Sequence, residues 1–193
     1  MKEVITEFWR CFAEHRLELK RIESADDPAY DVVLQALQQI DDGLYFEFCS
    51  TPGTNELIVT AEGKKELFPL VEEIVREAPH IDDWQVFALK PKRGFPVTTR
   101  WEQTKLLIGD VVVLPVFRET GEMALRLYIP GLSEKNQEDI HNALLRVLDS
   151  GLGERRFAEC IEATWVYPLS DAPSQAFPLS DLDDYLDCRD AEG

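Results

Sequence analysis

Cysteine is scarce in this sequence. The 193 residues include four cysteines, at positions 11, 49, 160 and 188, with no CxxC pair and no repeated spacing. The sequence therefore predicts neither a disulfide framework nor a zinc knuckle nor a thioredoxin-like redox site. A chain of this length can bury a sizeable core without cross-links. We expect free thiols and a reducing, cytoplasmic environment.

Long hydrophobic runs are also missing. The longest, VVVLPVF at 111–117, is far too short to cross a bilayer. The first residues include acids and lack a small-residue cleavage site, so we expect no signal peptide. The composition, 45% hydrophobic and 30% charged, is typical of a soluble globular protein.

Positive charge is in short supply. Twenty Lys and Arg face 37 Asp and Glu, which gives a formal net charge of -17. Residues 90–110, with five bases and two acids, form the one segment of positive net charge. Such a chain should repel nucleic acid and anionic membranes and attract basic proteins, although acidity can also serve solubility alone.

Catalytic signatures are lacking as well. The sequence has no G-x-S-x-G, no P-loop and no complete dinucleotide fingerprint. Cys11 and His15 lie one helical turn apart, but a metal needs more ligands than two. Adjacent acids, such as Asp183 and Asp184, diverge from one another and do not form an acid–base couple. We expect no catalytic residue, no metal and no cofactor, and we lean against an enzyme.

Hydrophobic periodicity indicates alternating helices and strands. Helical spacing marks 3–22, 28–42, 65–78 and 133–153, and a Thr99/Glu102 capping box suggests a short helix over 99–108. Strand patterns follow the ranges 43–50, 56–63, 84–90, 110–117, 124–131 and 157–168. Pro115 points to an edge strand or a bulge.

The order of these elements repeats. After a lead helix, two helix-strand-strand-helix-strand units occupy about 27–91 and 99–168. We expect an α+β fold in which each unit places its first strand between two parallel ones. The six strands would form a mixed, largely antiparallel sheet with helices mainly on one face, although two separate lobes are an alternative. Residues 1–170 would be one compact domain, and 171–193 an acidic tail.

Two surfaces are candidate binding sites. Strand alternation puts polar and aromatic residues on one wet face of the sheet, namely Tyr45, Glu47, Arg126, Tyr128, Glu162 and Thr164. The basic connector between the units has the arginine-aromatic composition of interface hot spots. Its candidates are Lys92, Arg93, Phe95, Arg100 and Trp101. Alternatively, the two aromatic residues anchor a linker whose charges face solvent.

The acidic tail is the third candidate. Ser180 and Asp183 form a capping-box pattern, which predicts a short helix with an apolar edge. Its candidate residues are Leu182, Asp183, Asp184 and Tyr185. An acidic amphipathic helix fits a basic, partly apolar groove, so we expect it to dock on the connector. The other possibility is a frayed, solubilising tail.

These observations favour a non-enzymatic, cytoplasmic protein-binding module that recognises a basic protein, as an immunity protein or an inhibitor does. A second reading is a small-molecule or anion-binding protein, or an enzyme, in which Arg93 or Arg100 and Arg126 grip an anion in a pocket between the units. A third is a structural subunit of a homo-oligomer.

Overall fold

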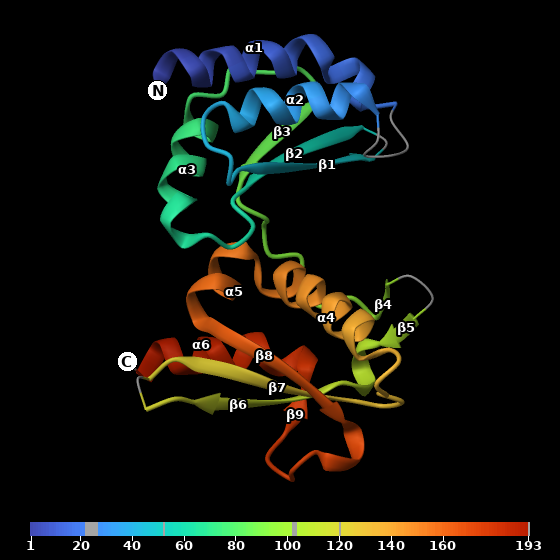
Figure 1. Cartoon of the computed structure of the whole chain (residues 1–193). Coiled ribbons are helices and arrows are strands. Elements are labelled where there is room, and N and C mark those ends of the chain that lie inside the picture. Colours follow the sequence, from blue (N-terminus) through green and yellow to red (C-terminus); the bar gives the residue numbers. More distant parts are fainter. Residues whose placement is uncertain (22–26, 52, 102–103, 120, 193) are drawn as a thin grey trace. The chain divides into compact units, whose positions relative to one another are not determined.

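The computed structural model describes residues 1–21, 27–51, 53–101, 104–119 and 121–192. These ranges contain six α-helices and nine strands in an α+β arrangement that begins with a helix (Figure 1). The chain divides into two compact units, Met1–Pro91 and Lys92–Gly193, and each is described by itself. No helix among the described residues is long and apolar enough to span a membrane.

The N-terminal unit packs helices on a three-stranded sheet. Its elements are α1 (Lys2–Leu19), α2 (Pro28–Gln38), β1 (Tyr45–Thr51), β2 (Thr54–Thr60), α3 (Phe68–Arg76) and β3 (Trp84–Ala88). β1 is antiparallel to β2, and β2 is parallel to β3. Helices α1 and α2 lie together on one face of this sheet (Figure 1).

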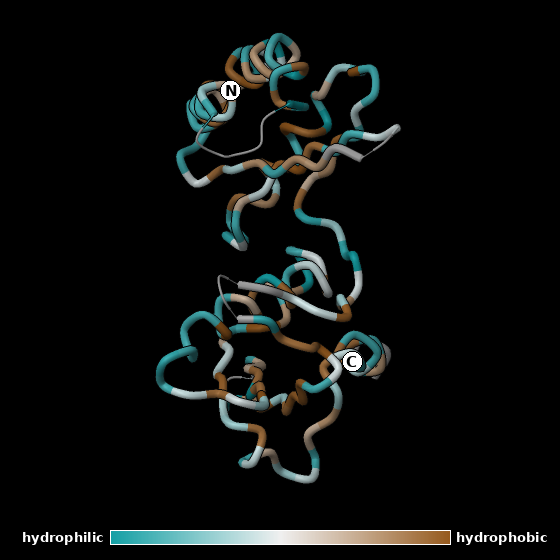
Figure 2. The backbone as a smooth tube through the Cα atoms, turned by 90° about the vertical axis from the view of Figure 1, so that its right-hand side faces the viewer, coloured by the Kyte–Doolittle hydropathy of each residue, from teal (hydrophilic) through white to brown (hydrophobic). Residues whose placement is uncertain are grey.

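Local sequence signals explain these helices. In α1 the buried residues Ile5, Phe8 and Phe12 recur at helical spacing and face the core. Asp27 caps α2 by accepting a hydrogen bond from the Ala29 amide at 2.9 Å, with Pro28 at the first helical position. Figure 2 colours the backbone by hydropathy and shows hydrophobic and hydrophilic residues interspersed along the elements of each unit.

The C-terminal unit contains two sheets. Its strands are β4 (Thr98–Trp101), β5 (Thr104–Leu107), β6 (Val112–Phe117), β7 (Met123–Ile129), β8 (Ile161–Pro168) and β9 (Phe177–Pro178). Its helices are α4 (Gln137–Leu152), α5 (Glu154–Cys160) and α6 (Leu182–Glu192). β4 and β5 pair with each other, and the larger sheet has the order β8-β7-β6-β9. Pro115 lies beyond the part of β6 that pairs with β9, as a proline on an unpaired edge should.

The expected single six-stranded sheet is wrong for the described strands, which form sheets of three, two and four strands. The predicted strand order is also wrong. The second strand of each unit is central, because the helical crossover returns directly beside the strand that it leaves. The first strand lies at its other edge, antiparallel to it.

The predicted helix over 99–108 is an antiparallel hairpin, in which Thr98 pairs with Leu107 and Trp101 with Thr104. Thr and Trp favour strands, and so short a helix has little stability of its own. Glu102, the other half of the expected capping box, lies outside the described residues.

The predicted helix over 133–153 begins at Gln137 and continues after a break. Gly151, the expected end, lies inside α4, and the break falls at Gly153, whose φ of 82° is in the region that glycine tolerates. Residues 154–160, of which 157–160 were expected to start the last strand, form α5.

A bulge changes which residues of β8 face the helices. Met123 pairs with Ile161, but Ala124 pairs with Ala163, so one extra residue interrupts the alternation. Strict alternation from Glu162 and Thr164 predicts Val166 on the wet face, but Val166 belongs to the buried core. The same alternation predicts that Trp165 packs on the helices, but Trp165 is 38% exposed. Thr164 also faces the helices, since its hydroxyl lies 2.7 Å from Nε2 of His141 in α4.

Candidate acidic interface

The connector is anchored along α4 by its backbone and by one aromatic ring. The Arg93 amide donates to the Ser150 carbonyl at 2.8 Å, and Gly94 adopts a φ of 79°. The half-buried Phe95 ring packs against the core and covers Gly151. The Arg93 side chain is exposed. Phe95 is thus part of the internal packing of this unit.

The sequence-predicted residues Arg100 and Trp101 lie in β4, where Arg100 pairs with Lys105. Their side chains lie outside the described part of the structure. Arg126 is exposed on β7, with its guanidinium 5.9 Å from the centre of the Tyr167 ring. The three arginines of the anion-pocket reading are therefore not brought to one described site.

The tail contacts the connector. Asp183 of α6 forms ion pairs with Lys92 and, at 2.9 Å, with Arg156 of α5. Arg156 also lies 2.6 Å from Asp187. Leu182 is fully buried in the core, Tyr185 stacks on Phe177 with ring centroids 5.2 Å apart, and Asp184 is exposed. α6 is integrated into the C-terminal unit by both apolar and ionic contacts.

The acids of α6 approach one another as metal ligands would. Carboxylate oxygens of Asp183, Asp184 and Asp187 lie within 4.8 Å of each other. The Arg156 guanidinium already forms ion pairs with two of these carboxylates, Asp183 and Asp187. Exposed acidic clusters are common without a metal, and we assign none here.

The predicted wet sheet face falls on two separate units. In the N-terminal unit, Tyr45 is 37% exposed, and Glu47 pairs with Lys90 at 3.2 Å. Lys90 also pairs with Glu62 at 3.0 Å, so both of these carboxylates already have a basic partner. The helices cover the opposite face, where Phe46 stacks on Tyr30 of α2.

In the C-terminal unit, the same predicted face is covered at Tyr128 but exposed at Arg126 and Glu162. Tyr128 is 4% exposed, and its ring stacks on that of Tyr167 at 5.6 Å. Glu162 is exposed beside the bulge. The predicted set therefore does not form one groove.

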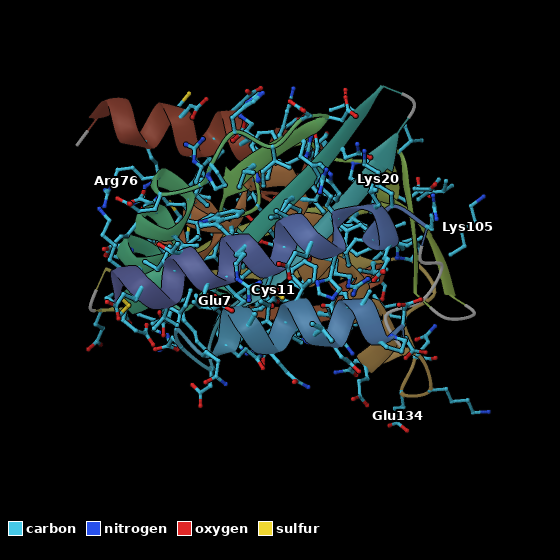
Figure 3. All side chains as sticks on the ribbon, turned by 90° about the horizontal axis from the view of Figure 1, so that it is seen from above. Glu7, Cys11, Lys20, Arg76, Lys105 and Glu134 are labelled. Carbon is cyan, nitrogen blue, oxygen red and sulfur yellow. The ribbon has the colours of Figure 1, made fainter. Side chains whose placement is uncertain are left out.

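A surface that the sequence analysis did not single out lies on α1 and α2, where exposed acids outnumber exposed bases. We call it the acidic helix face, and it consists of Glu3, Glu7, Glu14, Glu18 and Asp31 with the apolar Leu17 and Val32. Leu17 is 53% and Val32 42% exposed. The Sγ of Cys11 lies 3.9 Å from the Val32 carbonyl oxygen, which places the two helices side by side. Figure 3 looks down on them, with Glu7 and Cys11 labelled on α1.

One positive charge on this face, that of Arg10, is already engaged by acids of the same helix. Arg10 lies 2.5 Å from Glu7 and 2.5 Å from Glu14, one helical turn to either side. Its hydrogen bond lowers the pKa of Glu7, and the two carboxylates raise the pKa of Arg10. The helical spacing of acids at 3, 7, 14 and 18 was the sequence signal that could have revealed this surface.

The pair Cys11 and His15 is not set up for catalysis. Sγ of Cys11 is 3.8 Å from Nδ1 of His15, but Nδ1 lies closer, at 2.8 Å, to the Cys11 carbonyl oxygen. Burial raises the pKa of the Cys11 thiol, and the negative charge of Glu14 raises it further. A thiol held protonated is a poor nucleophile.

Cys11 can therefore report on the field of the acidic helix face. Glu14→Gln removes a charge that raises the thiol pKa, so alkylation of Cys11 at mildly alkaline pH should become faster. Mass spectrometry of the alkylated peptide measures the rate. Glu3 lies on the same helix but is not among the charges that shift the pKa of Cys11, so Glu3→Gln should leave the alkylation rate unchanged. Equal acceleration by both variants would contradict a local effect of Glu14.

Comparison with known proteins does not identify the chain. A scan against protein-family models gives no match, and a search of curated proteins gives no significantly similar sequence. We therefore infer the function from the geometry and charge of the chain itself.

Proposed function

We propose that this chain is a non-enzymatic, acidic binding module whose acidic helix face engages a basic protein. An immunity protein or an inhibitor that masks a basic surface would act in this way. The net charge of -17 supports the proposal, because a field of this sign speeds encounter with a basic partner.

One observation carries the proposal, namely the combination of acids with exposed apolar side chains on the same face. Exposed charge alone supplies solubility and steering, but little affinity. Leu17 and Val32 add exposed apolar area on the two helices that carry the acids, and a partner can bury it. Arg10 is held by two acids of its own helix, so an incoming Lys or Arg meets the remaining carboxylates.

The proposal can be tested with a fluorescent amphipathic peptide of lysine and leucine. Wild-type protein should bind it, and Glu18→Lys should weaken binding by about tenfold, because one attraction becomes a repulsion. Glu134→Lys makes the same charge change at an exposed position of the C-terminal unit, labelled in Figure 3. It should preserve most of the affinity.

Equal losses of peptide affinity in the two variants would mean that net charge, and not this face, attracts the peptide.

Affinity purification from the cells that produce this protein extends the test to natural partners. A basic protein retained by wild type and by Glu134→Lys, but lost with Glu18→Lys, would be the expected partner.

We also propose that the two units descend from one duplicated element. Both contain two antiparallel strands and then a helical crossover to a third strand parallel to the second. The hairpin at 98–107 replaces the helix expected before the second copy, so the correspondence begins at β6.

A further inference from the structure

The strand β8 forms one edge of the larger sheet in the C-terminal unit. Among the described residues its only neighbouring strand is β7, with which it pairs from Ile161 to Pro168. For the stretch 163–167, the one hydrogen bond found outside this ladder in the described chain joins the side chains of Thr164 and His141. A strand directs its backbone groups alternately to its two sides, so the outer N–H and C=O groups of this stretch have no partner among the described residues.

Proteins usually protect such an edge with charged residues, prolines or bulges. The strand β8 has these devices at its two ends, where Glu162 lies in the bulge and Pro168 is the last residue. The sequence between them, ATWVY at 163–167, contains no charge, no proline and no glycine. The edge of β6 beyond β9 differs, because Pro115 has no N–H to offer there. The middle of β8 is therefore an unprotected edge.

The side chains beside this edge leave apolar area exposed. Trp165 is 38% exposed, and Leu169, the residue that follows the strand, is 37% exposed. Arg126, which is next to Trp165 in the ladder, is also exposed and lies over the Tyr167 ring at 5.9 Å. Aromatic and arginine side chains are enriched in the parts of interfaces that contribute most to binding. A further strand paired to β8 would cover Trp165 and would also satisfy the open backbone groups.

The strand β8 is complementary to itself. Two copies can pair as antiparallel strands about a two-fold axis at Trp165, because every paired position then lies on the same face of both strands. The opposed residues are Ala163 with Tyr167, Thr164 with Val166, and Glu162 with Pro168. This register places no two charges opposite each other, and it pairs β-branched and aromatic residues, which favour strands.

We infer that β8 of one copy pairs with β8 of a second copy in this register, which joins their four-stranded sheets into one. A second copy is the occupant because its edge is open over the same residues, so each strand supplies the donors and acceptors that the other lacks. Pairing about a two-fold axis uses both edges at once and closes the assembly as a dimer. Two chains of charge -17 repel each other, so the dimer should tighten as salt screens that repulsion. The pairing uses no residue of the acidic helix face, and the inference therefore goes beyond the proposed function.

Charge changes at the axis test the pairing by sedimentation equilibrium at moderate salt. Wild type should form a reversible dimer, and Trp165→Glu should weaken it by about tenfold, because two like charges then meet at the axis. Trp165→Lys should weaken it in the same way. An equal mixture of the two variants should associate more tightly than either variant alone, because glutamate then opposes lysine. Residue 165 is partly exposed, so both variants should fold, and circular dichroism checks that they do.

A cross-link gives a second measurement that does not depend on charge. Trp165→Cys should form an intermolecular disulfide with its own copy under mild oxidation, and mass spectrometry of the linked peptide identifies it. The reason is that residues directly opposite in antiparallel strands have Cα atoms about 4.5–5.5 Å apart, which is within disulfide range. Phe117, which is 48% exposed on β6 of the same sheet, provides matched controls. Phe117→Cys should not cross-link to itself, and Phe117→Glu should dimerise as wild type does.

Three results would each overturn the inference. The first is a wild type that stays monomeric at every salt concentration, which would leave the edge to a strand of another protein. The second is equal weakening by Trp165→Glu and Phe117→Glu, which would place the contact elsewhere. The third is a mixture of Trp165→Glu and Trp165→Lys that associates no more tightly than either variant alone.

The lysine and leucine peptide separates this failure from failure of the proposed function. Trp165→Glu should bind the peptide as wild type does, because the acidic helix face is unchanged. Salt should weaken peptide binding while it tightens the dimer. Peptide binding without a dimer would show that the pairing is wrong and leave the proposed function standing. A dimer without peptide binding would support the pairing and contradict the proposed function.

Discussion

Leu182→Ala is expected to destabilise the C-terminal unit by about 2–5 kcal/mol, the usual cost of deleting a buried leucine side chain. Leu182 is fully buried, and it shares the core with Leu179 and Leu186 of the same C-terminal segment. These side chains join strands β6 and β7 and helix α4 in one cluster. The loss should appear as a lower midpoint in chemical denaturation of the whole chain.

Asp184→Ala provides the control for Leu182→Ala. Asp184 is the exposed neighbour two residues along α6, and alanine there improves helix propensity. Its midpoint should equal or exceed that of wild type. If Leu182→Ala left the midpoint unchanged, α6 would not be part of the folded core, and the alternative of a frayed tail would be correct.

The position of α6 also changes how the acidic tail is understood. From its composition, the segment 171–193 could equally have been a frayed tail, because seven acids oppose one base. Three leucines at 179, 182 and 186 decide the outcome, since they remove their side chains entirely or almost entirely from water. Lys92 and Arg156 then fix the orientation through Asp183. Apolar burial supplies most of the energy, and the ion pairs, being partly exposed, add less.

Helices and strands with strong local signals could be predicted from the sequence. The lead helix follows from apolar residues at helical spacing, and α2 follows from Asp27, Pro28 and the apolar stripe behind them. The strands at 45–51 and 123–129 follow from alternation. In each case local propensity and tertiary burial agree, which is the condition for a correct prediction.

The errors arose where non-local structure decides. The bulge in β8 shifts the alternation by one residue, so Trp165 and Val166 exchange faces, and no pattern within the strand announces it. The segment 98–107 carries a capping-box pattern that is typical of a helix start. It nevertheless forms a hairpin, because pairing between β4 and β5 and their contact with α4 stabilise the strands more than a short helix. The division of the strands into separate sheets depends on which strand edges pair with each other. Hydrophobic periodicity within a strand carries no information about that pairing.

The candidate site was harder to predict than the fold. Unusual residues stand out in a sequence, which favoured the basic connector and the mixed sheet face as candidate sites. In the structure, however, Phe95 of the connector and Tyr128 of the sheet face are internal packing residues. Acids on a helix look ordinary in sequence, because a solvated helix face normally carries charges. The exposed Leu17 and Val32 among those acids became visible once the structure separated exposed from buried apolar residues.

Gly151→Ala is expected to destabilise the C-terminal unit by about 1–3 kcal/mol, the range for overpacking a filled core. At an open helical position the same change would stabilise the protein by about 0.5–1 kcal/mol. A Cβ at Gly151 would lie 2.4 Å from Cε1 and 2.6 Å from Cδ1 of Phe95. The ring packs against the core, and the hydrogen bond from the Arg93 backbone N–H to the Ser150 carbonyl oxygen holds the adjoining backbone, so Phe95 cannot simply move away.

Two further variants make the clash with Phe95 testable by thermal or chemical unfolding. Gly109→Ala introduces the same methyl group where no atom lies within 4 Å, and it should be neutral or stabilising. Phe95→Leu combined with Gly151→Ala should cost less than the sum of the single changes, because the smaller side chain makes room for the methyl group. Strict additivity would instead show that the alanine and the ring do not touch. The connector would then not be fixed to α4 by Phe95, and the hairpin of β4 and β5 that follows it would not be anchored through this ring.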